Sequence, residues 1–174
     1  ENEFSAANIE RAMEDLDEPL TDGLVRTSEK IYDALLLGKS YPETVGDGKM
    51  LSFNLKYIDW DCLENNVFHV TEEFCVESQD KQHNARPDIV LFINGIPFAV
   101  MECKAPQVSV DQAVEQMIRN QQADYIPQLF KYAQIVMATN KNAVKYATTG
   151  TPKKFWNVWK EQEEQWLQTK LDSL

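Results

Sequence analysis

Cysteine and histidine are scarce in this 174-residue sequence, which has three Cys and two His. The cysteines stand at positions 62, 75 and 103 without a Cys-x-x-Cys pair, which argues against a disulfide framework and against a zinc site. Six Gly and seven Pro are too few for a collagen-like or low-complexity chain. We therefore expect an ordinary globular domain whose thiols are reduced and mostly buried.

Long apolar stretches are also missing. The longest cover residues 89–93 and 96–101, far short of the ~18 residues of a membrane span. No basic-then-apolar leader opens the chain, so we expect a cytoplasmic protein that has no membrane partner. The first residue is Glu rather than Met, so we expect the chain to be processed, trimmed or cut from something longer. A Gly-x-x-x-x-Gly-Lys phosphate loop is absent, which argues against an ATPase in this stretch.

Positive charge is in short supply in the first half of the chain. The net charge is −11, and residues 1–80 contain 19 Asp and Glu against 6 Lys and Arg. Residues 81–174 contain 9 against 11. An overall acidic chain is unusual for a nucleic-acid partner, but the asymmetry predicts two faces with different partners, or an acidic face that serves solubility.

Periodicity along the chain predicts an α/β domain. Apolar spacing predicts helices over residues 6–16 and 28–37, strands over 50–58 and 67–77, and loops over 41–49 and 78–85. Further on it predicts a helix capped by Ser109, short strands at 135–138 and 143–146, and a last helix opened by Thr151-Pro152. We expect the tryptophans of that last helix to pack in a core rather than to stack on bases: Trp156, Trp159 and Trp166.

The most informative stretch is a hairpin. Apolar residues 89–93 and 96–101 flank Asn94-Gly95, the strongest short hairpin signal. Both faces of both strands are apolar, so we expect them at the centre of a sheet that is covered on both sides.

Three charged residues stand at the ends of these strands: Asp88, Glu102 and Lys104. A buried charge costs free energy unless it is paired or bound to a cation. Glu102 and Lys104 share one strand face, because side chains repeat every two residues. Two carboxylates beside a lysine suit Mg²⁺, with water activation and phosphate neutralisation as the matching chemistry. The plain alternative is a turn-capping Asp88 and an exposed charge pair on an edge strand.

The turn decides whether Asp88 joins the other two. A two-residue Asn94-Gly95 loop places Asp88 opposite Met101, on the face away from Glu102. A three-residue loop with a left-handed Gly95 at a bulge brings Asp88 onto the face of Glu102. A shared metal site therefore predicts either this longer loop or an irregularity elsewhere in the hairpin.

Pro87-Asp88 followed by Glu102-Cys103-Lys104 resembles the PD-(D/E)xK nuclease signature. The longer segments 86–97, 102–106, 128–132 and 138–140 are similar to the N-terminal nuclease domain of the type I restriction enzyme R (motor) subunit. The resemblance covers nearly the whole chain and is weakest over residues 1–45. It implies a restriction-endonuclease-like fold, with a central mixed β-sheet flanked by α-helices.

The resemblance also implies roles for individual residues. Asp88, Glu102 and Lys104 would be catalytic. Asp88 and Glu102 would bind the metal together with the backbone carbonyl of Cys103.

Accessory residues follow from the same resemblance. The family's Gln-x-x-x-Tyr motif places Gln116 at its first position, but Asn120 stands where Tyr is expected. The bare pattern also matches two other pairs, Gln121 with Tyr125 and Gln128 with Tyr132. An upstream acidic residue falls on an early helix, where Glu10 is a candidate. The candidates for contact with the DNA backbone are Lys81 and Arg86.

The implied function is Mg²⁺-dependent cleavage of double-stranded DNA within a type I restriction complex. The partners would be the DNA, the motor domain of the same subunit, and the modification and specificity subunits, with ATP bound by the full-length subunit outside this chain. We expect one nuclease domain over residues 1–174, with a helical part at 1–45, a core at 46–150 and a C-terminal helix at 151–174 leading toward the motor. A catalytically silent module that positions DNA or docks subunits, and a repair-type nuclease on the same fold, stand as alternatives.

Overall fold

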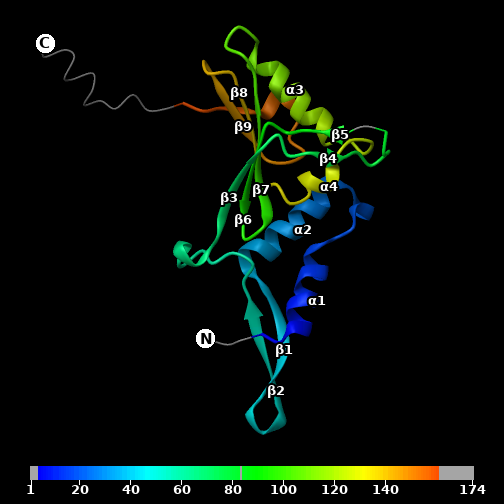
Figure 1. Cartoon of the computed structure of the whole chain (residues 1–174), viewed down its shortest axis with the longest axis vertical. Helices are drawn as coiled ribbons and strands as arrows, with labels where there is room; N and C mark the ends of the chain where they lie inside the picture. Colours follow the sequence, from blue (N-terminus) through cyan, green and yellow to red (C-terminus); the bar gives the residue numbers. More distant parts are fainter. Residues whose placement is uncertain (1–3, 83, 161–174) are drawn as a thin grey trace, which may run out of the picture.

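The computed structural model, which describes residues 4–82 and 84–160, is built around a six-stranded sheet in the order β10-β9-β8-β7-β6-β3 (Figure 1). The strands are β3 (Phe68–Glu72), β6 (Ile89–Ile93), β7 (Ile96–Cys103), β8 (Ile135–Thr139), β9 (Val144–Ala147) and β10 (Asn157–Val158). Neighbouring strands are antiparallel except for β7 and β8, which are parallel. A parallel pair needs a crossover, and helices α3 (Val110–Asn120) and α4 (Pro127–Phe130) lie in it. This mixed sheet with its helices confirms the predicted fold class.

The β6–β7 hairpin has a two-residue turn, as in the first alternative, together with a bulge further along the strands. Asn94 and Gly95 both have positive φ, 52° and 82°, and join Ile93 directly to Ile96. The three-residue loop is therefore wrong. The register then shifts, because Leu91 pairs with Ala99 whereas Phe92 pairs with Pro97, which leaves Phe98 as an extra residue in a β-bulge.

The bulge places the side chains of Asp88 and Glu102 on the same face of the sheet, as a shared site requires. Beyond it, Val90 pairs with Val100 and Ile89 with Met101. The next residues of this register, Asp88 and Glu102, therefore stand opposite each other. Directly opposed residues of an antiparallel pair share one face of the sheet, so the irregularity brings both carboxylates to the same side.

Gly95→Val is expected to destabilise the domain by about 1–3 kcal/mol, because a β-branched residue is strained at positive φ. A Cβ atom added at Gly95 would meet nothing within 4 Å, so we expect backbone strain to dominate the effect. Denaturant unfolding of the two proteins measures it. Gly46→Val is a matched control, since Gly46 faces equally open space without positive φ. Equal losses in the two variants would contradict this account of the turn.

Helix α3 covers one face of the sheet and forms the main core. Ser109 caps it by accepting a hydrogen bond from the backbone N–H of Asp111. Its inward side is formed by Ala113, Val114 and Met117, which are fully buried. They pack in one cluster with sheet residues that include Val90, Val100, Val136 and Ala138.

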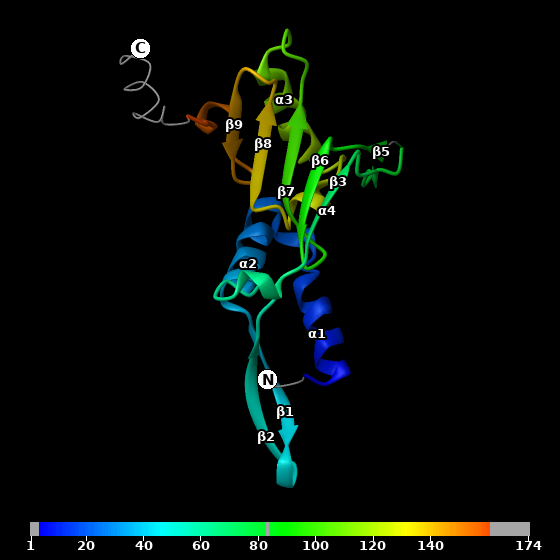
Figure 2. The same ribbon diagram turned by 60° about the vertical axis from the view of Figure 1, so that its left-hand side comes forward.

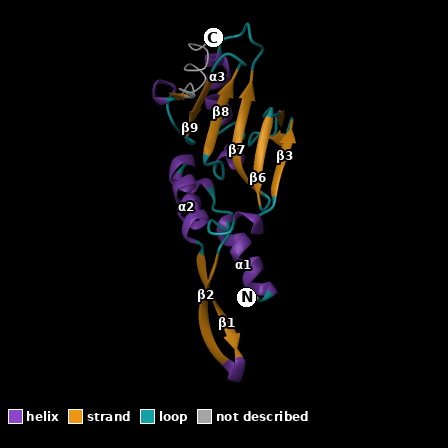
Figure 3. Cartoon of the chain, turned by 90° about the vertical axis from the view of Figure 1, so that its left-hand side faces the viewer, coloured by secondary structure: helices purple, strands orange, loops and turns teal. Residues whose placement is uncertain are grey.

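Over residues 4–82 and 84–160 the opposite face of the sheet is open, so for this part of the chain the prediction of cover on both sides is wrong. Figure 1 shows the sheet nearly edge-on, with α3 on one side of it, and Figure 3 shows the open face. Within the described part of the chain no helix covers that face, and Val70 on it is 65% exposed. Leu91 and Ile135 are also exposed. The apolar character of both faces was read correctly, but apolar composition alone does not ensure an intramolecular cover.

The N-terminal part forms a separate layer at one end of the sheet (Figure 2). Helix α1 (Ala6–Leu16) is as predicted, whereas α2 (Leu24–Leu37) begins four residues before the expected Ser28. The predicted loop at 41–49 is wrong. It contributes β1 (Lys39–Val45), which pairs with β2 (Lys49–Leu55) in a projecting two-stranded ribbon. The reason is burial of Tyr41, whose hydroxyl donates to the Asp15 carboxylate.

Other local predictions also need correction. The strand expected over 67–77 is interrupted at Glu73, which has φ +49°, and resumes as the short β4 (Val76–Glu77), paired with β5 (Asn84–Ala85). Cys62 and Cys75 are exposed rather than buried.

The C-terminal stretch differs from its prediction as well. The helix expected from Thr151 is replaced by a 3-10 turn (Lys153–Phe155) and β10. Trp156 enters the core, its indole N–H donating to the Thr151 carbonyl, but Trp159 is exposed. Residues 161–174, with Trp166, lie outside the described residues.

Candidate active site

Strand register brings Asp88 and Glu102 together beneath α3. The Asp88 carboxylate accepts a hydrogen bond from the backbone N–H of Cys103 at 2.6 Å. The backbone carbonyl of Asp88 accepts another from the N–H of Glu73 at 2.9 Å. Asp88 is therefore held at both its main chain and its side chain, directly beside the strand that carries Glu102.

Glu102 is a buried carboxyl group with an exposed fraction of 0%. Two amides of α3 donate to it. The Gln116 Nε2 lies 2.7 Å from its Oε2, and the Asn120 Nδ2 lies 3.3 Å from its Oε1. A buried carboxylate is tolerated only when its oxygens have such partners.

The pKa of Glu102 is raised to about 8, and burial is the largest cause. The negative charge of Asp88 and a hydrogen bond between the two carboxyl groups contribute to this shift, while Lys104 and Gln116 oppose it. Without a cation, the pair therefore favours a state in which Glu102 keeps its proton. Burial and the same two carboxylates also raise the pKa of the Cys103 thiol.

Lys104 joins the cluster through Gln116. Its Nζ donates to Gln116 Oε1 at 2.5 Å, and the other end of the same amide donates to Glu102. The backbone N–H of Lys104 donates to the carbonyl of Thr139 on β8. One glutamine thus links the lysine to the buried carboxyl group and orients both.

The donor set fits one hard divalent cation. Asp88 and Glu102 supply two carboxyl groups whose mutual repulsion a cation would relieve. Cys103 adds a main-chain oxygen on the same side, because the N–H and C=O of a strand residue point to the same neighbour and this N–H faces Asp88. Among residues 4–82 and 84–160, no group of three or more His, Cys, Asp and Glu is placed to hold a metal. The side-chain ligands of such a site would therefore be these two carboxylates.

The other predicted accessory residues lie outside this cluster. Lys81 and Arg86 are exposed around the β4–β5 pair, Arg86 two residues before Asp88. Glu10, the candidate for the upstream acidic residue, is on α1, which packs along β1 at the ribbon end of the molecule, apart from the Asp88–Glu102 cluster (Figure 2). The other two Gln-x-x-x-Tyr matches also lie elsewhere: Gln121 donates to the Met117 carbonyl, and Gln128 to the Glu77 carbonyl.

Asn120 is the residue that sequence reasoning missed. It was noted only as a departure from a motif. Its position four residues after Gln116 was the available signal, since residues i and i+4 lie on one face of a helix. The structure places both amides on the Glu102 carboxyl group.

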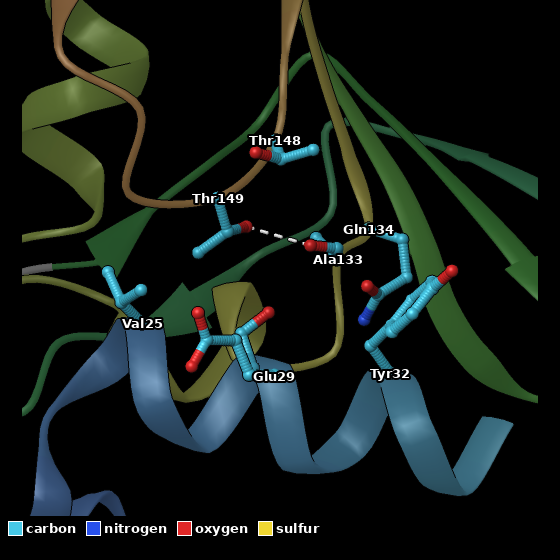
Figure 4. A pocket seen from close by; sticks show the side chains of 8 residues that line it. Val25, Glu29, Tyr32, Ala133, Gln134, Thr148 and Thr149 are labelled. Atoms are coloured by element: carbon cyan, nitrogen blue, oxygen red, sulfur yellow. Dashed lines mark hydrogen bonds between the residues drawn. The ribbon is translucent and has the colours of Figure 1, made fainter. Parts of the chain in front are cut away.

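A separate pocket of about 280 Å³ lies between α2 and the turn after β9 (Figure 4). Val25, Glu29 and Tyr32 line it from the helix side. The hydroxyl of Thr149 is already committed, since it donates to the Ala133 carbonyl at 2.7 Å. The pocket shares no lining residue with the Asp88–Glu102 cluster and brings a single carboxylate, so it lacks the convergent groups of an active site.

Comparison with known proteins defines the class of the chain. The family model of the type I restriction enzyme R protein N terminus matches residues 1–155, and the chain belongs to this family. It is 32% identical over 140 residues to the MjaIXP type I restriction endonuclease subunit of Methanocaldococcus jannaschii, covering 77% of this chain and 13% of the relative. It is 26% identical over 151 residues to the EcoprrI endonuclease subunit of Escherichia coli, covering 86% and 45%. The chain thus spans less than half the length of either relative.

No helix within the described residues is long and apolar enough to cross a membrane.

Proposed function

We propose that this chain is the nuclease module of a type I restriction enzyme and that it hydrolyses phosphodiester bonds of double-stranded DNA with a divalent cation, Mg²⁺, as cofactor. The observation that carries the proposal is the pairing of Asp88 with the buried Glu102, with Lys104 tied to the same carboxyl group. Family membership and the names of the relatives support the restriction system.

The residues divide the chemistry between them. Asp88 and Glu102 would hold the cation, together with the Cys103 carbonyl. A bound Mg²⁺ supplies charge neutralisation at the phosphate and a more acidic water. Lys104 places a positive charge beside the scissile phosphate and stabilises the charge that develops there. Gln116 keeps Lys104 and Glu102 in fixed relation through its two amide ends.

DNA binding and targeting are expected to depend on other parts of the complex. The net charge of −11 opposes association with a polyanion. Lys81 and Arg86 are the exposed cations that we propose contact the DNA backbone near the site. The motor domain of the full-length subunit would bind ATP, and the modification and specificity subunits would direct the complex to its DNA.

Cation dependence tests the proposal directly. The full-length subunit, assembled with its partner subunits, is incubated with supercoiled plasmid and ATP over a Mg²⁺ titration. Because the motor also uses Mg²⁺ with ATP, Asp88→Asn serves as the matched protein: it preserves the shape of the side chain and removes its charge. We expect wild-type cleavage to rise with Mg²⁺ while Asp88→Asn shows none at concentrations that support full ATP hydrolysis. Equal cleavage by both proteins would refute the proposal.

A catalytically silent docking module is the second candidate. The paired carboxylates argue against it, because a purely structural domain gains nothing from burying Glu102 beside a like charge. The same plasmid experiment separates the two, since a silent module predicts no effect of Asp88→Asn on cleavage.

A further inference from the structure

Asn120 occupies a position where a polar side chain is costly. It is the last residue of α3 and is only 2% exposed. A buried amide loses its hydrogen bonds to water, and an apolar side chain of similar volume would avoid that loss. The residue next in sequence, Gln121, makes contacts that hold the fold: it donates to the Met117 carbonyl and accepts from the Gly150 N–H. The Asn120 amide instead points at Glu102.

The two amides of α3 divide the Glu102 carboxyl group between them. Gln116 donates to Oε2 and Asn120 to Oε1. Two donors on two different oxygens fix the carboxyl plane, whereas a single donor would leave it free to rotate about its terminal torsion. Each carboxylate oxygen has a second lone pair. Each Glu102 oxygen accepts one hydrogen bond from α3, so its second lone pair is left for a partner on the side of Asp88.

We propose that Asn120 is a positioning residue for the cation: it holds Oε1 of Glu102 so that the free lone pairs of Glu102 and Asp88 converge on one divalent ion. The inference rests on the proposed function, because it requires a cation at this pair. It assigns to Asn120 a role that differs from that of Gln116, which also orients Lys104. Removal of Asn120 should therefore weaken cation binding and leave the lysine in place.

Calorimetric titration of Mn²⁺ into the full-length subunit without nucleotide tests the role without relying on activity. The part of the Mn²⁺ binding heat that is present in the wild type and absent in Asp88→Ala is assigned to the nuclease site. We expect Asn120→Leu to weaken binding at that site by about 10-fold or more, the usual range for residues that orient a metal ligand. Asn120→Ala is expected to do the same. Asn120→Leu fills the space of the side chain and Asn120→Ala empties it. A loss of Mn²⁺ affinity in both variants therefore results from the missing amide rather than from altered packing.

Gln121→Leu is the matched control, because it removes a buried amide of the same helix that does not touch Glu102. We expect it to lower the melting temperature and to leave Mn²⁺ affinity within 2-fold.

Mg²⁺ titration of cleavage adds a second readout: the Asn120 variants should need about 10-fold more Mg²⁺ and approach wild-type turnover at saturation. If the Asn120 variants bind Mn²⁺ no more weakly than Gln121→Leu while Asp88→Ala abolishes the site, Asn120 is not a positioning residue and the proposed function stands. If Asp88→Ala changes no Mn²⁺ heat, the cation site itself is refuted and this inference with it.

Discussion

Alanine at Asp88, Glu102 or Lys104 is expected to lower DNA cleavage by the assembled restriction complex at least about 10²–10³-fold, while ATP hydrolysis by the complex stays near the wild-type rate. Under the proposed function, each substitution removes a group that acts on the developing charge or holds the cation, whereas ATP would be bound by the motor domain of the full-length subunit. Cleavage of plasmid DNA and phosphate release, measured on the same preparations, give the two rates.

Glu115→Ala and Lys153→Ala serve as controls for that series. These residues form an exposed ion pair at 2.7 Å, one of them on α3, so they reproduce the loss of an acid and of a lysine away from the cluster. Exposed pairs contribute little to stability, and cleavage should stay within about 2-fold of wild type. The assignment of the active site would be contradicted if Asp88→Ala cleaved DNA at the wild-type rate, or if the two control variants lost as much cleavage as the site variants.

Without a cation, the domain should become less stable as pH rises from about 5 to about 8. The pKa of Glu102 is raised from 4.5 in the unfolded chain to about 8 in the folded protein. Between these values the folded protein keeps a proton that the unfolded chain releases, so each increment of pH favours unfolding. The lowered pKa values of Asp15 and Asp17 act in the opposite sense, but below this window.

Glu102→Gln should remove most of that slope. Gln keeps the shape of Glu102 and carries no charge, so we expect stabilisation on the order of 1–3 kcal/mol at pH 8, or roughly 3–10 °C in melting temperature. Thermal unfolding in a chelating buffer from pH 5 to 8.5 measures it. Addition of Mg²⁺ at pH 8 should raise the melting temperature of the wild type more than that of the variant. A variant that retains the wild-type slope would show that Glu102 is not the titrating group.

Strand period and turn chemistry predicted the centre of the molecule well. The positions of β6, β7, α3 and β8 follow from short apolar runs, Asn94-Gly95 and the Ser109 cap. Strand β1 was missed because Pro42 and the Gly-rich tip are typical of a loop, whereas β2 largely coincides with the strand predicted over 50–58. Tertiary contacts override that local preference: the side-chain amide of Asn8 donates to the Pro42 carbonyl, and Tyr41 is buried against α1.

The site was predictable only in part. Spacing placed Glu102 and Lys104 on one face and made the facing of Asp88 depend on the turn, and the resemblance added Gln116; the structure brings all four together. The bulge residue could not be located from local sequence. Phe98 packs against Trp60, with ring centroids 6.1 Å apart, and joins the cluster formed by Leu16, Ile31, Leu35 and Ile58. Its conformation therefore depends on residues distant in sequence.

The bulge also has an arithmetic consequence for the motif itself. In a hairpin closed by a two-residue turn, opposed residues are separated by odd numbers, as Ile93 and Ile96 are. Past Phe98 the separations become even, and Asp88 and Glu102 stand fourteen residues apart. Because side chains alternate between the two faces, one residue inserted or deleted between the two carboxylates moves them to opposite faces of the sheet. A second change of opposite sign returns them to the same face. In any hairpin with the same two-residue turn whose two motif acids share one face of the sheet, an even interval between those acids therefore requires a bulge.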